Sequence, residues 1–234
     1  MSLAAFLPQL SQPVPAQKIY IFNILNSEWS DGEKMIEEQQ VFCELLREKE
    51  ESLIQKIERL EGWLHREQGE WLAFLASHVP HTLTIVEPGS HKGRSTAWLS
   101  LGSRLGNKAP IYCVDSWCGN EKQQLPWSYP AFEENLRRLN LWERVNPIHG
   151  LTVAVSKNWH TPIGLLFIDA GHAFEEALAD YYAWYPFVCS GGWLVMHDTG
   201  ILAGPTRVVE EVIKPSGLWT NFHDILQACV AMRK

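Results

Sequence analysis

Apolar residues recur at spacings of three, four or seven between residues 31 and 64, with glutamates, lysines and arginines between them. The stripe consists of Phe42, Leu46, Leu53, Ile57, Leu60 and Leu64. This spacing predicts an amphipathic helix, because residues three or four apart share one helix face. Residues 1–28 are irregular, with prolines at positions 8, 13 and 15. We therefore expect an N-terminal extension, residues 1–59, whose helix packs on the main domain, covers an active site as a lid, or joins two copies in a homodimer.

The pattern changes near residue 71, where short apolar runs begin to alternate with helical segments. The runs at 83–89, 110–117, 144–150, 163–171, 191–198 and 227–234 predict strands, and the segments 94–106, 130–142, 173–188 and 206–216 predict helices. Strands that alternate with helices are typical of a parallel sheet covered by helices on both faces. We expect residues 60–234 to form one such α/β domain.

Composition and charge narrow the function classes. A chain of 234 residues with 46% hydrophobic residues suits one sizeable domain with a proper core. The net charge of -7 disfavours a broad nucleic-acid-binding surface. Five scattered cysteines without a CxxC pair indicate reduced thiols, and no apolar window approaches 18 residues. We expect a cytoplasmic protein with no membrane span and no secretory signal.

Two loops after predicted strands carry candidate binding residues, because ligands of such sheets bind beyond the carboxyl ends of the strands. The first loop, EPGSHKG, places Glu87 at a strand end and glycines at 89 and 93. It is not the dinucleotide fingerprint, and a carboxylate there suits a cationic cofactor better than a pyrophosphate. Asp115 ends the second strand, where an acid can accept hydrogen bonds from ribose hydroxyls. A plain tight turn, a turn cap at Asp115 and a core role for Trp117 are the structural alternatives.

Acids and imidazoles follow the next two strands. Asp169 ends one apolar run and His172 comes three residues later, while His197 and Asp198 end the following run. Since carboxyl ends of parallel strands meet at one edge of a sheet, we expect these side chains to share that edge.

Three stretches, IVEPGSHKGRSTAWLS, IYCVDSW and LLFIDAGHAFEEALADYYAWYPFVCSGGWLVMHD, resemble successive motifs of class I S-adenosylmethionine-dependent methyltransferases. More narrowly, they resemble the small-molecule group that includes sugar and macrolide O-methyltransferases. The resemblance covers about residues 60–234. It implies a Rossmann-like, doubly wound, mostly parallel seven-stranded sheet with helices on both faces. It also implies S-adenosylmethionine as cofactor and a small-molecule acceptor.

The resemblance assigns roles residue by residue. Residues of the first loop would surround the methionine part of the cofactor, and Asp115 would bind its ribose. The first-loop residues are Glu87, Gly89, Ser90 and Gly93, and adenine contacts are implied for Trp117 and Gly150. Two positions depart from the pattern: Pro88 replaces a small aliphatic residue, and Ala170 replaces a glycine.

Methyl transfer to a hydroxyl requires alignment and removal of a proton, by a general base or by a metal that lowers the hydroxyl pKa. His172 is the natural base, and Asp169 and Asp198 are oxygen ligands suited to Mg²⁺. In metal-using relatives an acidic pair follows strand five, but here His197 precedes Asp198, which weakens a magnesium site or favours another divalent cation. The predicted metal ligands are Asp169, His197 and Asp198. His197 as a hydrogen-bond partner of Asp169 or of the substrate, and His172 as a helix cap, remain alternatives.

The sequence therefore favours a small-molecule O-methyltransferase. A metal-dependent hydrolase or oxygenase on the same fold would use the acids and histidines but would leave the glycine loop and Asp115 unexplained. A cofactor-binding protein without catalysis is the third possibility, and the pairing of His172 with Asp169 argues against it.

Overall fold

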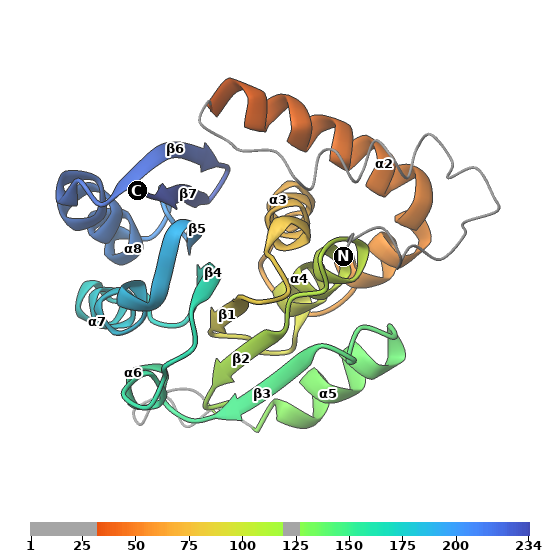
Figure 1. Ribbon diagram of the computed structural model, residues 1–234. Coiled ribbons are helices and arrows are strands. Elements are labelled where there is room, and N and C mark those ends of the chain that lie inside the picture. The colour runs from red at the N-terminus through yellow and green to blue at the C-terminus, as the bar shows by residue number, and fades with distance from the viewer. Residues whose placement is uncertain (1–31, 119–126) are drawn as a thin grey trace, which may run out of the picture.

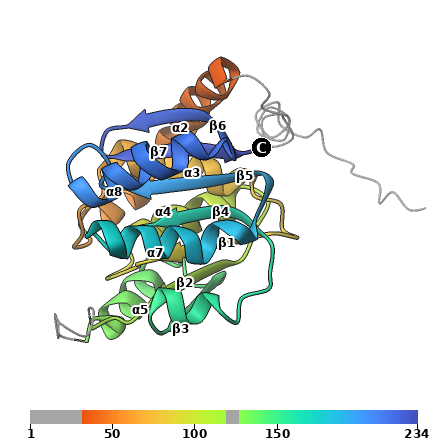
Figure 2. The same ribbon diagram turned by 90° about the vertical axis from the view of Figure 1, so that its left-hand side faces the viewer.

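A computed structural model describes residues 32–118 and 127–234. Seven strands form one sheet in the order β3-β2-β1-β4-β5-β7-β6 (Figure 2). Their bounds are β1 Thr84–Pro88, β2 Ile111–Asp115, β3 Val145–His149, β4 Ile163–Ile168, β5 Val188–His197, β6 Trp219–Ile225 and β7 Ala228–Arg233. β7 runs antiparallel to both β5 and β6, and the other paired strands are parallel. The predicted mostly parallel, seven-stranded, doubly wound fold is confirmed.

Helices cover both faces of the sheet (Figure 1). One face carries α2 Gly32–Glu58, α3 Arg66–His78, α4 Arg94–Leu105 and α5 Tyr129–Arg138. The other carries α6 Thr152–Ser156, α7 Phe174–Trp184 and α8 Ala203–Arg207, with a π-helical turn Val208–Ile213 and 3-10 turns Tyr185–Phe187 and Lys214–Ser216. The alternation of β4 divides the core between these faces: Leu165 and Phe167 pack on the first side, and Leu166 and Ile168 on the second.

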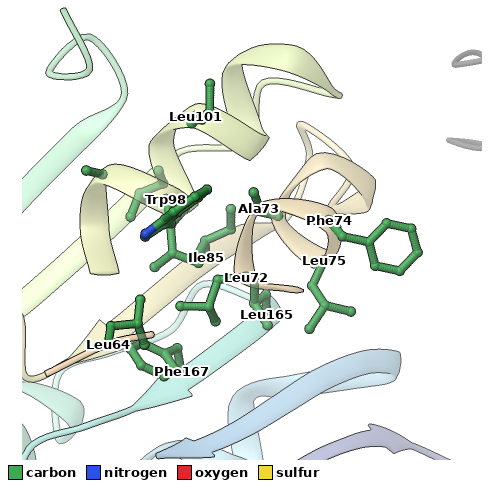
Figure 3. Packing of buried hydrophobic residues seen from close by; sticks show 14 of the residues in the cluster. Leu64, Leu72, Ala73, Phe74, Leu75, Ile85, Trp98, Leu101, Leu165 and Phe167 are labelled. Carbon is green, nitrogen blue, oxygen red and sulfur yellow. The ribbon is translucent and has the colours of Figure 1, made fainter. Parts of the chain in front are cut away.

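α3 and α4 approach each other closely over the sheet, and this packing depends on glycine (Figure 3). A Cβ added at Gly69 of α3 would lie 2.3 Å from the buried Trp98 ring, and one at Gly102 of α4 would lie 2.0 Å from the Ala73 carbonyl oxygen. Both positions therefore exclude any larger residue. The sequence reasoning did not predict α3.

The predicted amphipathic helix is present, but it ends at Glu58 rather than near Leu64. Its apolar face, including Met35, Leu46 and Ile57, is buried in the core cluster shared with α3 and α4. The guanidinium of Arg47 also donates to the buried carboxylate of Glu70 on α3 at 2.7 and 2.5 Å. The stripe is therefore used within one chain, and a homodimer through α2 would have to use its solvent-facing side.

Two other boundaries differ from the sequence prediction. The segment predicted as a helix over 206–216 holds only the last two residues of α8, followed by π and 3-10 turns. The strand β6 was not predicted. β6 alternates poorly because it is an edge strand, in which Asn221 and His223 are partly exposed and Asp224 is exposed. Within the described ranges, no helix is long and apolar enough to cross a membrane.

Candidate active site

Backbone hydrogen bonds join the ends of four strands at the carboxyl edge of the sheet. The Gly89 N–H donates to the Val114 carbonyl, the Asp169 N–H to the Pro88 carbonyl, and the Gly150 N–H to the Asp115 carbonyl, each at 2.9 Å. The loops that follow β1, β2, β3 and β4 therefore meet at one place. This edge brings the predicted cofactor and catalytic residues together.

The glycine loop, residues 87–93, needs its two glycines for different reasons. Gly89 has φ 90°, and a Cβ there would lie 2.4 Å from the Asp169 carbonyl oxygen. Gly93 has φ 85° and forms the N-cap of α4. Both conformations are left-handed, which favours glycine, and the close approach at Gly89 leaves no room for a side chain.

Glu87 lies behind this loop rather than at its open side. Its carboxylate is fully buried and accepts hydrogen bonds from Ser90 Oγ at 2.9 Å, Ser95 Oγ at 2.5 Å and Thr96 Oγ1 at 2.5 Å. Burial raises the pKa of Glu87 to about 7, although the three hydroxyl groups oppose the shift. In this arrangement Glu87 holds the turn in shape, and it exposes no atom to a ligand at the carboxyl edge.

Asp115 holds the opposite side of the glycine loop. Its Oδ2 accepts from the backbone N–H groups of Ser90 and His91, both at 2.8 Å, and its Oδ1 accepts from the Trp117 N–H at 2.7 Å. An ionised carboxylate can accept about four hydrogen bonds, so one site remains for a ribose hydroxyl. The turn cap considered from the sequence is present, and it leaves room for the predicted ribose contact.

Trp117 packs in an aromatic cluster, and 1% of its surface is exposed. Its ring centroid lies 4.8 Å from that of Tyr129 and 5.1 Å from that of Phe132. An adenine contact would require an exposed face, which Trp117 does not offer here. Trp127, 49% exposed, stands edge-on to His149 at 4.9 Å and is the accessible aromatic residue of this cluster.

The acids and histidines form two linked pairs. His172 Nε2 lies 2.8 Å from Asp198 Oδ2. His197 Nδ1 lies 2.9 Å from Asp169 Oδ1 and 3.3 Å from Asp198 Oδ1, without a well-directed hydrogen bond to either. The side chain of His172 is 52% exposed and that of His197 only 3%. His172 is therefore the group that can meet a substrate.

Electrostatics separates the roles of the two histidines. The hydrogen bond with Asp198 raises the pKa of His172, against the effect of burial. Burial lowers the pKa of His197, but Asp169 and Asp198 outweigh it and raise that pKa well above its usual range. Burial raises the pKa of Asp198, but the two histidines outweigh it and lower that pKa in turn. His197 therefore lies buried behind the acids, whose charges favour its protonated form, but it lacks the well-directed hydrogen bond to Asp169 that the alternative predicted.

The set of atoms that can reach one metal ion differs from the predicted set in one residue. Single ligand atoms of Asp169, His172 and Asp198 lie within 4.8 Å of one another. Two carboxylate oxygens and one imidazole nitrogen suit a divalent cation. His197, predicted as the third ligand, instead lies buried behind Asp169 and Asp198. The carboxylates fit an ion, and the positive charge of His197 beside them weakens that fit.

Asp180 supports the site and was missed by sequence reasoning. Its Oδ2 accepts from the Gly171 N–H at 3.3 Å, and its Oδ1 accepts from the hydroxyl of Thr152 on α6. The carboxylate thereby fixes the loop between Asp169 and His172. A signal was available in the sequence, because Asp180 lies at helical spacing within the buried face formed by Ala177, Tyr181 and Trp184.

Known proteins resemble this chain in sequence and in fold. Residues 86–199 match a family model described as a methyltransferase domain. The fold is similar to the O-methyltransferase NovP, with 16% identity, a TM-score of 0.63 and coverage of 93% of this chain and 99% of that chain. It is also similar to cofactor-bound Rv0187 from MTB, with 18% identity, a TM-score of 0.59 and coverage of 95% and 98%. An O-methyltransferase from Bacillus cereus in complex with SAH shows 17% identity, a TM-score of 0.56 and coverage of 93% and 97%.

Proposed function

From the premise that residues 86–199 belong to the methyltransferase-domain family, we propose that the protein transfers a methyl group from S-adenosylmethionine to a hydroxyl of a small molecule. The observation that carries the hydroxyl assignment is the exposed His172, whose Nε2 lies 2.8 Å from Asp198 at the carboxyl edge. An imidazole held by a carboxylate is a common general base. The net charge of -7 agrees with a small-molecule acceptor rather than a nucleic acid.

The residues at the glycine loop fit the cofactor. Its methionine part would lie along the loop at Gly89, Ser90 and Gly93, which Glu87 supports from behind. Asp115 would use its remaining acceptor site for a ribose hydroxyl, and the adenine ring would lie near Gly150 and the exposed Trp127 rather than on the buried Trp117. When bound, S-adenosylmethionine supplies a methyl group on a sulfonium, which is already a good leaving group.

The protein then has to orient the acceptor and remove its proton. Because Nε2 of His172 is paired with Asp198, the other ring nitrogen, Nδ1, would take the proton from the hydroxyl. Asp198 would orient the ring and stabilise the imidazolium that forms. Asp169 lies beside the same point, and His197 offsets part of the charge of the two acids. This division gives each of the four residues a distinct role.

Asp169, His172 and Asp198 are the residues that would hold a divalent cation at this site. Such an ion would lower the pKa of the acceptor hydroxyl. An ion bound to the His172 ring would lower the basicity of that ring, so His172 serves either as a ligand or as the base. Turnover measured in EDTA and after addition of Mg²⁺ or Mn²⁺ separates the two arrangements.

The function is tested in two steps. Calorimetry with S-adenosylhomocysteine measures the cofactor site, and S-adenosylmethionine labelled in the methyl carbon then reports transfer to hydroxyl compounds by mass spectrometry. The His172→Ala variant should lose about 10²–10⁴-fold in turnover, the usual span for a lost general base, with cofactor affinity kept. His160→Ala is the matched control, because His160 is exposed just before β4 at the opposite edge of the sheet. Native turnover in His172→Ala would refute the role of the base, and absent cofactor binding would refute methyl transfer itself.

A further inference from the structure

The connection between α2 and α3 is fastened to the glycine loop and the start of α4. Arg94 Nη1 donates to the Gly62 carbonyl at 2.8 Å and to the Leu60 carbonyl at 3.4 Å. Lys92 Nζ lies 2.5 Å from Glu61 Oε2. A single exposed ion pair contributes little stability, but the contacts made by Leu60, Glu61 and Gly62 together hold the turn in position. The N-terminal helical layer therefore reaches the carboxyl edge of the sheet through residues 60–63.

This turn holds Trp63 in the solvent. Trp63 is 77% exposed, more than any other large hydrophobic residue in the described part of the chain. Leu60 and Leu64 on either side are buried, so the turn cannot rotate Trp63 inward without exposing them. The indole lies against the imidazole of His91, with centroids 5.7 Å apart and planes tilted by 31°. The indole of Trp63 thus exposes a large aromatic surface to solvent, and the contacts of the turn keep its backbone in position.

His91 connects this face to the reacting groups. Its backbone N–H donates to Asp115 Oδ2 at 2.8 Å, and Gly89 of the same loop packs against the backbone of Asp169. Burial and the neighbouring Lys92 lower the pKa of His91. The Trp63–His91 pair is therefore an aromatic wall that begins in the glycine loop, at the residue bonded to Asp115, and extends into solvent.

We propose, building on methyl transfer as the function, that Trp63 and His91 form the wall against which a ring of the acceptor stacks. The ring is aromatic or is the apolar face of a sugar, since both pack flat on an indole. The cofactor's own rings are assigned to Asp115 and Gly150, which leaves the acceptor as the ligand for the exposed face of Trp63. A face fixed before binding orders few groups when the ligand arrives, which favours its use in recognition.

The test uses protein saturated with S-adenosylhomocysteine and two separate ring probes, catechol and methyl β-glucopyranoside. Ligand-observed NMR measures the affinity of each probe for the wild type and for three variants. Trp63→Ala removes the wall, and Trp63→Phe keeps an aromatic face. Tyr182→Ala removes another exposed aromatic residue, 53% exposed near the end of α7. Because Trp63 is already exposed, its truncation leaves the core intact.

We expect at least one ring probe to bind the wild type and to bind Trp63→Ala about three- to tenfold more weakly, the span expected for one aromatic contact. Trp63→Phe should retain most of the affinity, and Tyr182→Ala should retain all of it. S-adenosylhomocysteine affinity should be the same in all four proteins. Equal probe affinity in Trp63→Ala, or no binding of either probe to the wild type, would contradict the proposal that Trp63 and His91 bind a ring of the acceptor. Failure of the wild type to bind S-adenosylhomocysteine refutes the methyl-transfer proposal instead.

Discussion

Glu87→Gln tests whether the buried carboxylate behind the glycine loop titrates near neutral pH. The folded protein raises the pKa of Glu87 from 4.5 to about 7 by burial, so between these values the folded chain retains a proton that the unfolded chain has lost. The free energy of unfolding therefore falls as the pH rises through this window. With 1.36 kcal/mol per pKa unit, the loss between pH 5 and pH 8 is about 2.5 kcal/mol. The amide of the substituted side chain cannot titrate, so the variant lacks this loss.

Urea denaturation of both proteins at pH 5 and pH 8 measures the effect. The stability of the wild type relative to Glu87→Gln should be about 2.5 kcal/mol lower at pH 8 than at pH 5, and other titrating groups cancel in this difference. Glu134→Gln, at an exposed position on α5, is the control and should show no such change. The same relative stability at both pH values would refute the reasoning, because Glu87 would then share one pKa in the folded and unfolded chains.

Three further predictions concern the active site and the helical layer. Asp198→Asn replaces the charged acceptor that raises the pKa of His172 with a neutral amide, so the rise of kcat/KM with pH, which follows loss of the His172 proton, should move to lower pH. An unmoved profile would exclude His172 paired with Asp198 as the base. Asp115→Ala leaves three backbone N–H groups without their carboxylate, and we expect at least about a tenfold loss of S-adenosylhomocysteine affinity in calorimetry. Unchanged affinity would refute the assignment of Asp115 to the ribose. Arg47→Met leaves the Glu70 carboxylate buried without its partner and should lower the free energy of unfolding, measured by urea denaturation, by about 2–3 kcal/mol. The loss is smaller than for a fully buried pair because Arg47 is half exposed. Recovery of stability in a double variant with Glu70→Leu separates the lost ion pair from lost packing.

Local patterns determined most of the fold. The apolar runs that end in Glu87, Asp115 and Asp169 predicted strands at the positions where the structure has β1, β2 and β4. An uninterrupted apolar run reports burial on both faces, which in an α/β domain means a central parallel strand. The spacing of glycine and acid along the chain then placed the candidate site, because every parallel strand delivers its following loop to the same edge.

Elements whose stability comes from distant partners were harder to predict. α3 contains Gly69, which is unfavourable inside a helix, and only the Trp98 ring packed against that position explains why a glycine is needed. β6 has no clear alternation because it pairs with β7 alone and exposes polar side chains at the sheet edge. In both cases the decisive contact lies in another element, and no local pattern records it.

The direction of each side chain at the carboxyl edge was decided by tertiary structure alone. Sequence placed Glu87, Trp117 and His197 in the right loops but could not show that Glu87 turns inward to three hydroxyl groups or that Trp117 is buried. The same holds for His197, which lies behind Asp169 and Asp198 while His172 takes the exposed position. A strand end fixes where a side chain begins, whereas its rotamer, burial and charge depend on residues that only folding brings near.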